Sequence, residues 1–237
     1  MPPKRYQRRG AKDPIDGALA SPFNIFNPHE GNAPIYDGES IIIVSIDPGI
    51  KNCGVYIFKY NMLNGRKRSL YLARLQFNQE ENNHYISSIK KFEALENKSH
   101  ILSRSHYIVI EKQMAISTQN TRMGQHLITF FCTFLRNKGK RPIIMEFSNQ
   151  AKTKLLKCPS KMKKPDYKKW CHRKAVELLE SRDNEEEEKY IERLTVAKKK
   201  DDMGDAICQG ETFIMSIETD FYVYPKPQKK EKEEEEE

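Results

Sequence analysis

The chain lacks several features that would place it in common protein classes. It has no uninterrupted apolar run of about 20 residues, so no segment predicts a helix that crosses a membrane. Its N-terminus carries Lys4, Arg5 and Arg8 but no apolar segment of the kind that a secretory signal contains. The five cysteines show no C-x-x-C pair, which favours reduced thiols over a disulfide framework. These absences together predict an intracellular protein without a membrane partner.

Charge is unevenly distributed along the chain. Lysine and arginine number 41 against 33 aspartates and glutamates, which gives a formal net charge of +8. Because Glu231 and residues 233–237 form an acidic tail, the rest of the chain is more basic than this total indicates. A basic body favours a polyanionic partner, either nucleic acid or anionic lipid.

Residues 40–218 contain the regular hydrophobic patterns of an α/β domain. Apolar and alternating runs predict five strands, at 41–46, 54–60, 70–77, 106–111 and 142–147. Helical spacing predicts helices at 82–97, 119–137 and 167–179, and a last helix from about Asp202. The order of these elements predicts a five-stranded mixed sheet flanked by helices.

The segments on either side of this domain have no sustained periodicity. Residues 1–39 are rich in proline, glycine, asparagine and charge, which predicts a basic and mostly disordered arm. Residues 219–237 predict a charged, acidic tail. Inside the domain, residues 152–169 predict a lysine-dense loop, and residues 185–188 predict a solvated helix face or loop.

Four acidic residues lie at the ends of predicted elements, where their side chains can converge. Asp47 closes the first buried strand and Glu111 the fourth, while Asp202 and Asp205 lie three apart and share one face of the last helix. Carboxylates placed in this way repel one another unless a cation lies among them. Mg²⁺ prefers oxygen ligands, and two such ions about 3.5–4 Å apart can hydrolyse a phosphodiester. The pattern therefore predicts a two-metal site for phosphodiester hydrolysis.

Each of these acids also has a simpler interpretation. Asp47 could be a turn residue, because aspartate is common before a Pro-Gly pair. Glu111 could form a salt bridge with a nearby basic residue, and Asp202 could be a helix-terminal acid that the helix dipole favours. Asp201 directly precedes Asp202, which leaves open which of the two is a metal ligand.

The segment from residue 152 to residue 174 has ten basic residues against one acid, a density typical of phosphate binding. We expect DNA contacts from this segment and from two residues that follow Asp47. The candidates are Lys51, Asn52, Lys152, Lys154, Lys161, Lys163, Lys164, Lys168, Lys169 and Arg173. Tyr167 and Trp170 could stack on bases, although we favour a core anchor for Trp170. The phenylalanines at 130, 131 and 134 predict either a dimer face or a core face.

Three segments resemble RuvC-like Holliday junction resolvases, and most closely the poxvirus-type enzymes of large cytoplasmic DNA viruses. In chain order they are IIIVSIDPGIKNCGVYIF (41–58), IVIEKQ (108–113) and KKKDDMGDA (198–206). The resemblance implies an RNase H-like fold, a homodimer, and paired nicks across a four-way DNA junction during viral DNA recombination or replication. It also implies two Mg²⁺ ions per active site, for which Mn²⁺ can substitute. For a viral enzyme we expect the host cytoplasm or a viral replication site, with the nucleus and the mitochondrion as alternatives.

Carried over residue by residue, the resemblance makes four acids the catalytic metal ligands: Asp47, Glu111, Asp202 and Asp205. Gln113 matches the glutamine of the E-[RK]-Q step, which implies a supporting role close to DNA. Lys198 and Lys200 belong to the basic run before the D-x-x-D pair, where they either contact the scissile phosphate or form a solvated loop.

Other functions share parts of this pattern. A ribonuclease H that cuts RNA–DNA hybrids has the same fold but must sense the 2′-hydroxyl, and no residue here marks such sensing. A catalytically inactive junction-binding module would keep the basic surface without cutting. A sugar-kinase or actin-like ATPase would need a second, duplicated domain, for which 237 residues leave no room.

Overall fold

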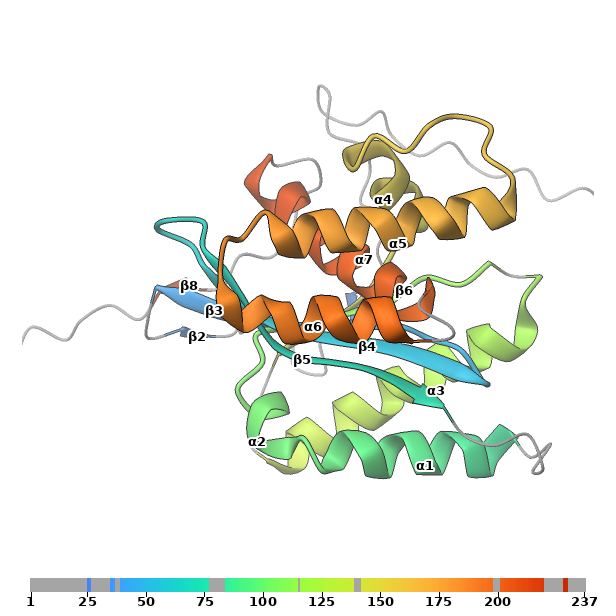
Figure 1. The fold of residues 1–237 in the computed structure, drawn as a ribbon. Helices are drawn as coiled ribbons and strands as arrows, with labels where there is room; N and C mark the ends of the chain where they lie inside the picture. The colour runs from blue at the N-terminus through green and yellow to red at the C-terminus, as the bar shows by residue number, and fades with distance from the viewer. Residues whose placement is uncertain are drawn as a thin grey trace, which may run out of the picture.

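A mixed β-sheet forms the centre of the domain, with helices on both faces (Figure 1). The computed structural model describes residues 39–76, 84–114, 116–138, 142–197 and 201–219. It also describes the backbone of residues 25–26, 35–36 and 228–229. The sheet has the strand order β1-β7-β6-β3-β4-β5. Its strands are β1 (Ile25–Phe26), β3 (Ser40–Asp47), β4 (Asn52–Asn61), β5 (Lys67–Gln76), β6 (Tyr107–Glu111) and β7 (Ile143–Phe147). A separate parallel pair consists of β2 (Ile35–Tyr36) and β8 (Gln228–Lys229).

Strand direction divides the sheet into two parts. β3, β4 and β5 form an antiparallel meander, whereas β6 runs parallel to β3 and β7 runs parallel to β6. The predicted five-stranded mixed sheet is therefore confirmed, with the short strand β1 added antiparallel at the β7 edge.

The helices form one layer on each face of the sheet (Figure 1). One layer contains α1 (His84–Glu96), α2 (Ser99–Leu102) and α3 (Thr118–Asn137). The other contains α4 (Asn149–Leu155), α5 (Lys164–Glu180), α6 (Glu185–Val196) and α7 (Asp201–Glu218). Of these, α7 packs directly on β3 and β4.

The sequence of β3 fills both layers, because successive side chains of a strand point to opposite faces. Ile41 and Ile43 belong to the core beneath α5 and α7. Ile42, Val44 and Ile46 belong to the core beneath α1 and α3. Since helices cover both faces, the strand is a continuous apolar run rather than an alternating one.

The predicted lysine-dense loop at 152–169 is wrong at both ends. Lys152 and Lys154 lie in α4, and α5 already begins at Lys164, so only the middle of the segment is irregular. The Ser148 hydroxyl caps α4 by accepting a hydrogen bond from the Gln150 amide, a helix start signal that the lysine density obscured.

Burial in the core decides between the alternative roles predicted for Trp170 and for the phenylalanines of α3. Trp170, a residue of α5, is buried in the core, which confirms its interpretation as a core anchor. Phe131 is fully buried as well, whereas Phe130 is half-buried and stacks on Phe92 of α1 with 4.7 Å between ring centroids. This helix face therefore contributes to the core.

Most of the predicted arm and tail lies outside the described residues, so the domain boundaries at 1–39, 40–218 and 219–237 stay predictions. In the part of the chain that the structure describes, no helix combines the length and apolar character needed to span a bilayer.

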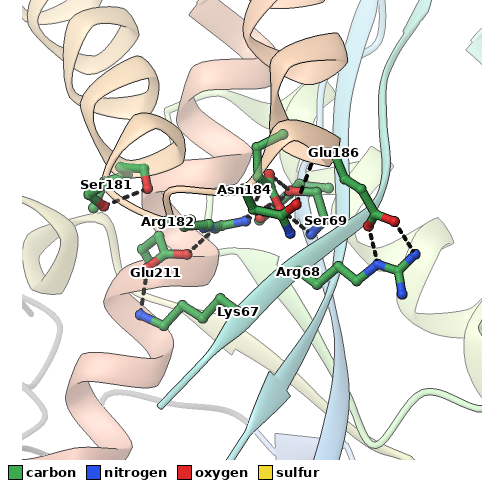
Figure 2. A network of polar contacts seen from close by, with 11 residues as sticks. Lys67, Arg68, Ser69, Ser181, Arg182, Asn184, Glu186 and Glu211 are labelled. Carbon is green, nitrogen blue, oxygen red and sulfur yellow. Dashed lines mark hydrogen bonds and ion pairs between the residues drawn. The ribbon is translucent and has the colours of Figure 1, made fainter. Parts of the chain in front are cut away.

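A buried polar network joins β5 to α6 and α7 (Figure 2). Arg182, in the turn between α5 and α6, lies 3.2 Å from Glu187 Oε2 through Nη1 and 2.5 Å from Glu211 Oε1 through Nη2. Glu187 also accepts hydrogen bonds from the backbone and hydroxyl of Ser69, at 2.7 and 2.5 Å. Lys67 contacts the second oxygen of Glu211 at 2.7 Å. The predicted solvated face at residues 185–188 is thus wrong for Glu187, whose side chain is 1% exposed.

Replacing Arg182 with methionine should destabilise the domain by about 3–5 kcal/mol, because the buried Glu187 would lose its cation and the buried Glu211 would keep only Lys67. Arg68→Met is the matched control, since its pair with Glu186 is half-exposed and should contribute at most about 1 kcal/mol. Urea unfolding followed by circular dichroism measures both losses. Equal losses in the two variants would contradict a structural role for the buried network.

Candidate active site

The carboxyl ends of β3 and β6 meet at one edge of the sheet. The two strands run parallel, with Ile46 opposite Ile110. Asp47 and Glu111 are the next residues on each strand, so they occupy neighbouring positions at this edge. The first two acids of the predicted site are therefore brought together by strand pairing alone.

Helix α7 brings the other two acids to the same edge. A Cβ atom on Gly54 of β4 would lie 2.0 Å from the carbonyl oxygen of Asp202, so only glycine lets the first turn of α7 approach this closely. Further along α7, Gln209 Nε2 donates hydrogen bonds to one backbone carbonyl of β3 and one of β6, at 3.2 and 2.9 Å. These contacts hold Asp202 and Asp205 beside the ends of both strands.

Lys152 of α4 lies inside this group of carboxylates. Its side chain is 1% exposed, and its Nζ lies 3.0 Å from Glu111 Oε2 and 2.6 Å from Asp205 Oδ1. Burial by itself lowers the pKa of Lys152, but Asp205 and Glu111 outweigh it and hold the pKa well above its usual value. Lys152 is therefore a buried cation. Any contact that it makes with DNA is confined to a phosphate at these carboxylates.

Asp205 is oriented by two donors that share one of its oxygens. Besides Lys152, the buried thiol of Cys171 on α5 donates to Asp205 Oδ1 at 3.1 Å. Both contacts fall on Oδ1, so among the described residues Oδ2 has no hydrogen-bond donor and is available to a ligand. The sequence did not indicate this role for Cys171, because an isolated cysteine carries no spacing signal.

Asp47, Glu111 and Asp202 all have raised carboxyl pKa values, so Lys152 alone does not offset their burial and mutual repulsion. Burial, followed by repulsion from Glu111 and Asp205, raises the pKa of Asp47 well above its usual value. Burial also raises the pKa of Glu111, although Lys152 opposes the change. The pKa of Asp202 rises to about 6, first through burial and then through the neighbouring Asp201. A further cation would lower the pKa of all three carboxyl groups.

The two adjacent aspartates at the start of α7 have different surroundings. Asp201 forms an ion pair with Lys168 of α5, so this predicted DNA contact is engaged within the chain. Asp202 Oδ2 is buried and has no hydrogen-bond partner among the described residues. The structure thus favours Asp202 over Asp201 as the oxygen donor of the site.

The loop after Asp47 is held from behind by a second buried lysine. Lys91 of α1 is fully buried, and its Nζ donates to the Ile50 carbonyl at 2.6 Å and to Ser87 Oγ at 2.6 Å. Ser87 Oγ donates to the same carbonyl at 2.9 Å. Burial lowers the pKa of Lys91 to about 8. The sequence did not identify Lys91, because it lies in a polar segment with weak helical periodicity.

The other predicted DNA contacts are near these carboxylates in the sequence, belong to the α4–α5 segment, or lie outside the described residues. Lys51 and Asn52 follow Asp47, and Gln113 lies in the loop that follows Glu111. In the α4–α5 segment, six further predicted contacts are exposed: Lys154, Lys161, Lys163, Lys164, Lys169 and Arg173. Lys198 and Lys200 lie outside the described residues.

The donor set suits a hard divalent cation such as Mg²⁺, which prefers carboxylate oxygens. Within the described ranges no three side chains of His, Cys, Asp or Glu are close enough to coordinate one ion, and Lys152 lies between the carboxylates. The buried oxygen of Asp202 without a partner and the raised carboxyl pKa values both indicate a need for added positive charge. Asp47, Glu111, Asp202 and Asp205 are the residues that could hold the ion.

No protein-family model matches this chain. Uncharacterized protein 97L of Invertebrate iridescent virus 3 is 23% identical over 125 residues, which cover 53% of this chain and 56% of that protein. Uncharacterized protein 170L of Invertebrate iridescent virus 6 is 29% identical over 139 residues, which cover 50% of this chain and 54% of that protein. The chain spans about half the length of these curated relatives.

Three solved structures share the fold at low sequence identity. The yeast mitochondrial Holliday junction resolvase has a TM-score of 0.53 and 17% identity, covering 77% of this chain and 82% of that one. The fowlpox virus resolvase with its substrate Holliday junction DNA has 0.51 and 16%, covering 75% and 99%. Thermus thermophilus RuvC with a Holliday junction substrate has 0.50 and 12%, covering 76% and 96%. The predicted RNase H-like fold is confirmed.

The raised carboxyl pKa values predict how stability depends on pH. The pKa of Asp202 rises from 3.8 to about 6 on folding, so this group stabilises the fold while protonated and stops doing so as pH rises through about 6. We expect the metal-free protein to have a lower Tm at about pH 7.5 than at about pH 5, and Mg²⁺ to raise Tm more at the higher pH. Differential scanning fluorimetry measures both effects. Asp202→Asn should weaken the pH dependence, and a Tm that rises with pH in the absence of metal would contradict the assignment.

Replacing Lys91 with methionine should loosen the loop after Asp47, because the Ile50 carbonyl would lose a charged donor. A hydrogen bond to a charged group contributes about 1.5–3 kcal/mol, so amide exchange across residues 48–52 should accelerate at least tenfold. Hydrogen–deuterium exchange with mass spectrometry measures the change. The control is Lys90→Met at the exposed neighbouring position. Equal exchange in both variants would show that Lys91 does not hold this loop.

Proposed function

We propose that this chain is a metal-dependent endonuclease that cuts DNA at four-way junctions. One observation carries the proposal: Asp47, Glu111, Asp202 and Asp205 converge from two parallel strand ends and one helix around a buried lysine. The fold shared with three Holliday junction resolvases supports the nuclease class. The relatives in two iridescent viruses support a viral setting, in which we propose a role in DNA recombination or replication.

Each residue of the site has a distinct task in this proposal. Bound to the four carboxylates, two Mg²⁺ ions would supply an activated water and stabilise the leaving 3′ oxygen, and Mn²⁺ can take their place. Asp47 and Glu111 hold fixed positions because they end paired strands. Cys171 and Lys152 orient Asp205 through a single oxygen. The Lys152 ammonium has three donors and uses two on carboxylates, so the third can bind a phosphate oxygen.

The junction as substrate requires two cuts that are related by symmetry. A homodimer would present two identical sites to a substrate that is itself roughly two-fold symmetric. We therefore propose a homodimer, which sedimentation or light scattering can test. The structures of fowlpox virus and Thermus thermophilus resolvases with Holliday junction DNA support branched DNA as the partner.

The decisive experiment compares a synthetic four-way junction with an RNA–DNA hybrid of equal length, each with Mg²⁺. Paired nicks in the junction and an intact hybrid are the expected result. Cutting of the hybrid with an intact junction would replace this proposal by ribonuclease H activity. Tight junction binding without nicks at any metal concentration would indicate an inactive binding module.

Asp47→Asn and Glu111→Gln should each reduce nicking by at least about a hundredfold, because a metal ligand contributes more than an outer partner does. Junction affinity should stay the same or increase, because each change removes negative charge near the phosphates. Gel-based cleavage and fluorescence anisotropy measure the two properties separately.

Asp201 and Asp202, which are adjacent at the start of α7, provide the control. Asp202→Asn should behave like Asp47→Asn, whereas Asp201→Asn should nick at nearly the wild-type rate. The reverse order would make Asp201 the ligand, and full activity in Asp47→Asn would rule out the four-carboxylate site.

A further inference from the structure

A hollow of about 450 Å³ opens between the end of α4 and the start of α5. Lys154, Lys157 and Lys161 line it together with Met162 and Tyr167, and no acidic residue does. Its volume is in the range of pockets that bind small ligands, about 300–1,000 Å³. Three ammonium groups around one hollow favour an anionic ligand.

Two of these lysines have a backbone conformation that suits glycine. Lys157 has a φ of 54° and Lys161 a φ of 61°, both in the left-handed region. At Lys157 the reason is clear, because α4 ends there in a Schellman motif. The amide of Cys158 donates to the Thr153 carbonyl at 2.8 Å, and the amide of Lys157 donates to the Lys154 carbonyl at 3.2 Å. Glycine usually occupies this position, since any Cβ atom destabilises it.

In the described part of the chain, no side-chain contact of these lysines offsets the strain. The side chains of Lys154, Lys157 and Lys161 form no hydrogen bond or ion pair with any described residue. Other lysines of the same segment do have partners, since Lys152 pairs with Glu111 and Lys168 with Asp201. The strained lysines therefore reduce stability without an internal contact in return, which is typical of residues that act on a ligand.

Two residues that line the hollow are close to the candidate site. Thr153, on its wall, directly follows Lys152 along α4. Tyr167, on the opposite wall, donates to Asn149 Oδ1 at 3.1 Å and so joins α5 to the first residue of α4. The charges of Lys152 and Asp205 act on the Tyr167 hydroxyl, whose pKa burial raises well above its usual value. A nucleic-acid strand whose phosphate lies at Lys152 would meet the hollow within a few nucleotides.

We propose that this hollow binds the backbone phosphates of the cut strand next to the scissile position, through Lys154, Lys157 and Lys161. The inference rests on the function proposed above and adds a defined subsite to it. Glycine would adopt the left-handed backbone conformation at positions 157 and 161 more easily than lysine. Lysine at these positions supplies a positive charge that glycine lacks.

The test separates backbone strain from charge. Lys157→Gly and Lys161→Gly relieve the strain and remove the charge, so each should raise Tm by about 1–3 °C. Together they should weaken junction binding and reduce the slope of log affinity against log salt by about 2, one for each lost phosphate contact. Lys157→Gln and Lys161→Gln keep the strain, so they should weaken binding equally with no gain in Tm.

Asp183→Gly is the matched control, because Asp183 is also left-handed, with a φ of 46°, but lies in the α5–α6 turn. It should leave junction affinity and its salt slope unchanged. Affinities are measured by anisotropy without Mg²⁺, so that no cutting interferes. An unchanged slope in the double glycine variant would overturn the subsite.

Phosphate mapping locates the contact. Neutral methylphosphonates are placed one at a time along the cut strand of the junction. In the wild type, one or two positions close to the cut should reduce affinity, and in the double glutamine variant the same positions should have no further effect. Persistence of the full effect in that variant would also overturn the subsite. Absence of nicking by the wild type would instead refute the proposed function, and weakened DNA binding by the glycine variants would still support the subsite.

Discussion

The parallel pairing of β3 with β6 is the constraint on which the rest of the candidate site depends. Parallel strands end at the same edge, and the register that sets Ile46 opposite Ile110 leaves Asp47 and Glu111 as neighbours there. Two buried carboxylates in neighbouring positions require positive charge nearby. Lys152 supplies part of that charge, and the acids of α7 add to the demand for positive charge.

Two fully or nearly fully buried lysines serve this edge from opposite layers of the fold. Lys152 comes from α4 and neutralises carboxylates, whereas Lys91 comes from α1 and holds a backbone carbonyl. A buried ammonium is stable only where several acceptors surround it. The two lysines therefore contact this edge and the loop after it from opposite faces of the sheet.

The sequence was sufficient for the elements that depend on local pattern. The continuous apolar run of β3 and the acid at its end predicted both the strand and the position of Asp47 beside Glu111. It was not sufficient for Lys152, because its partners lie 41 and 53 residues away and its neighbours in sequence are solvated lysines. Arg182 and Lys91 were missed for the same reason. Burial of a charged side chain is decided by tertiary partners, and no local periodicity records it.

The hydrogen bonds of Gln209 determine the rotational phase of α7. Asp205 precedes Gln209 by about one helical turn and Asp202 by about two, so the three side chains project from one side of the helix. Asp201 projects about 100° away from Asp202. If α7 slid by one residue, Asp201 would face the strand ends and both amide hydrogen bonds would break. An uncharged amide thus determines which of two adjacent and chemically identical acids faces the strand ends.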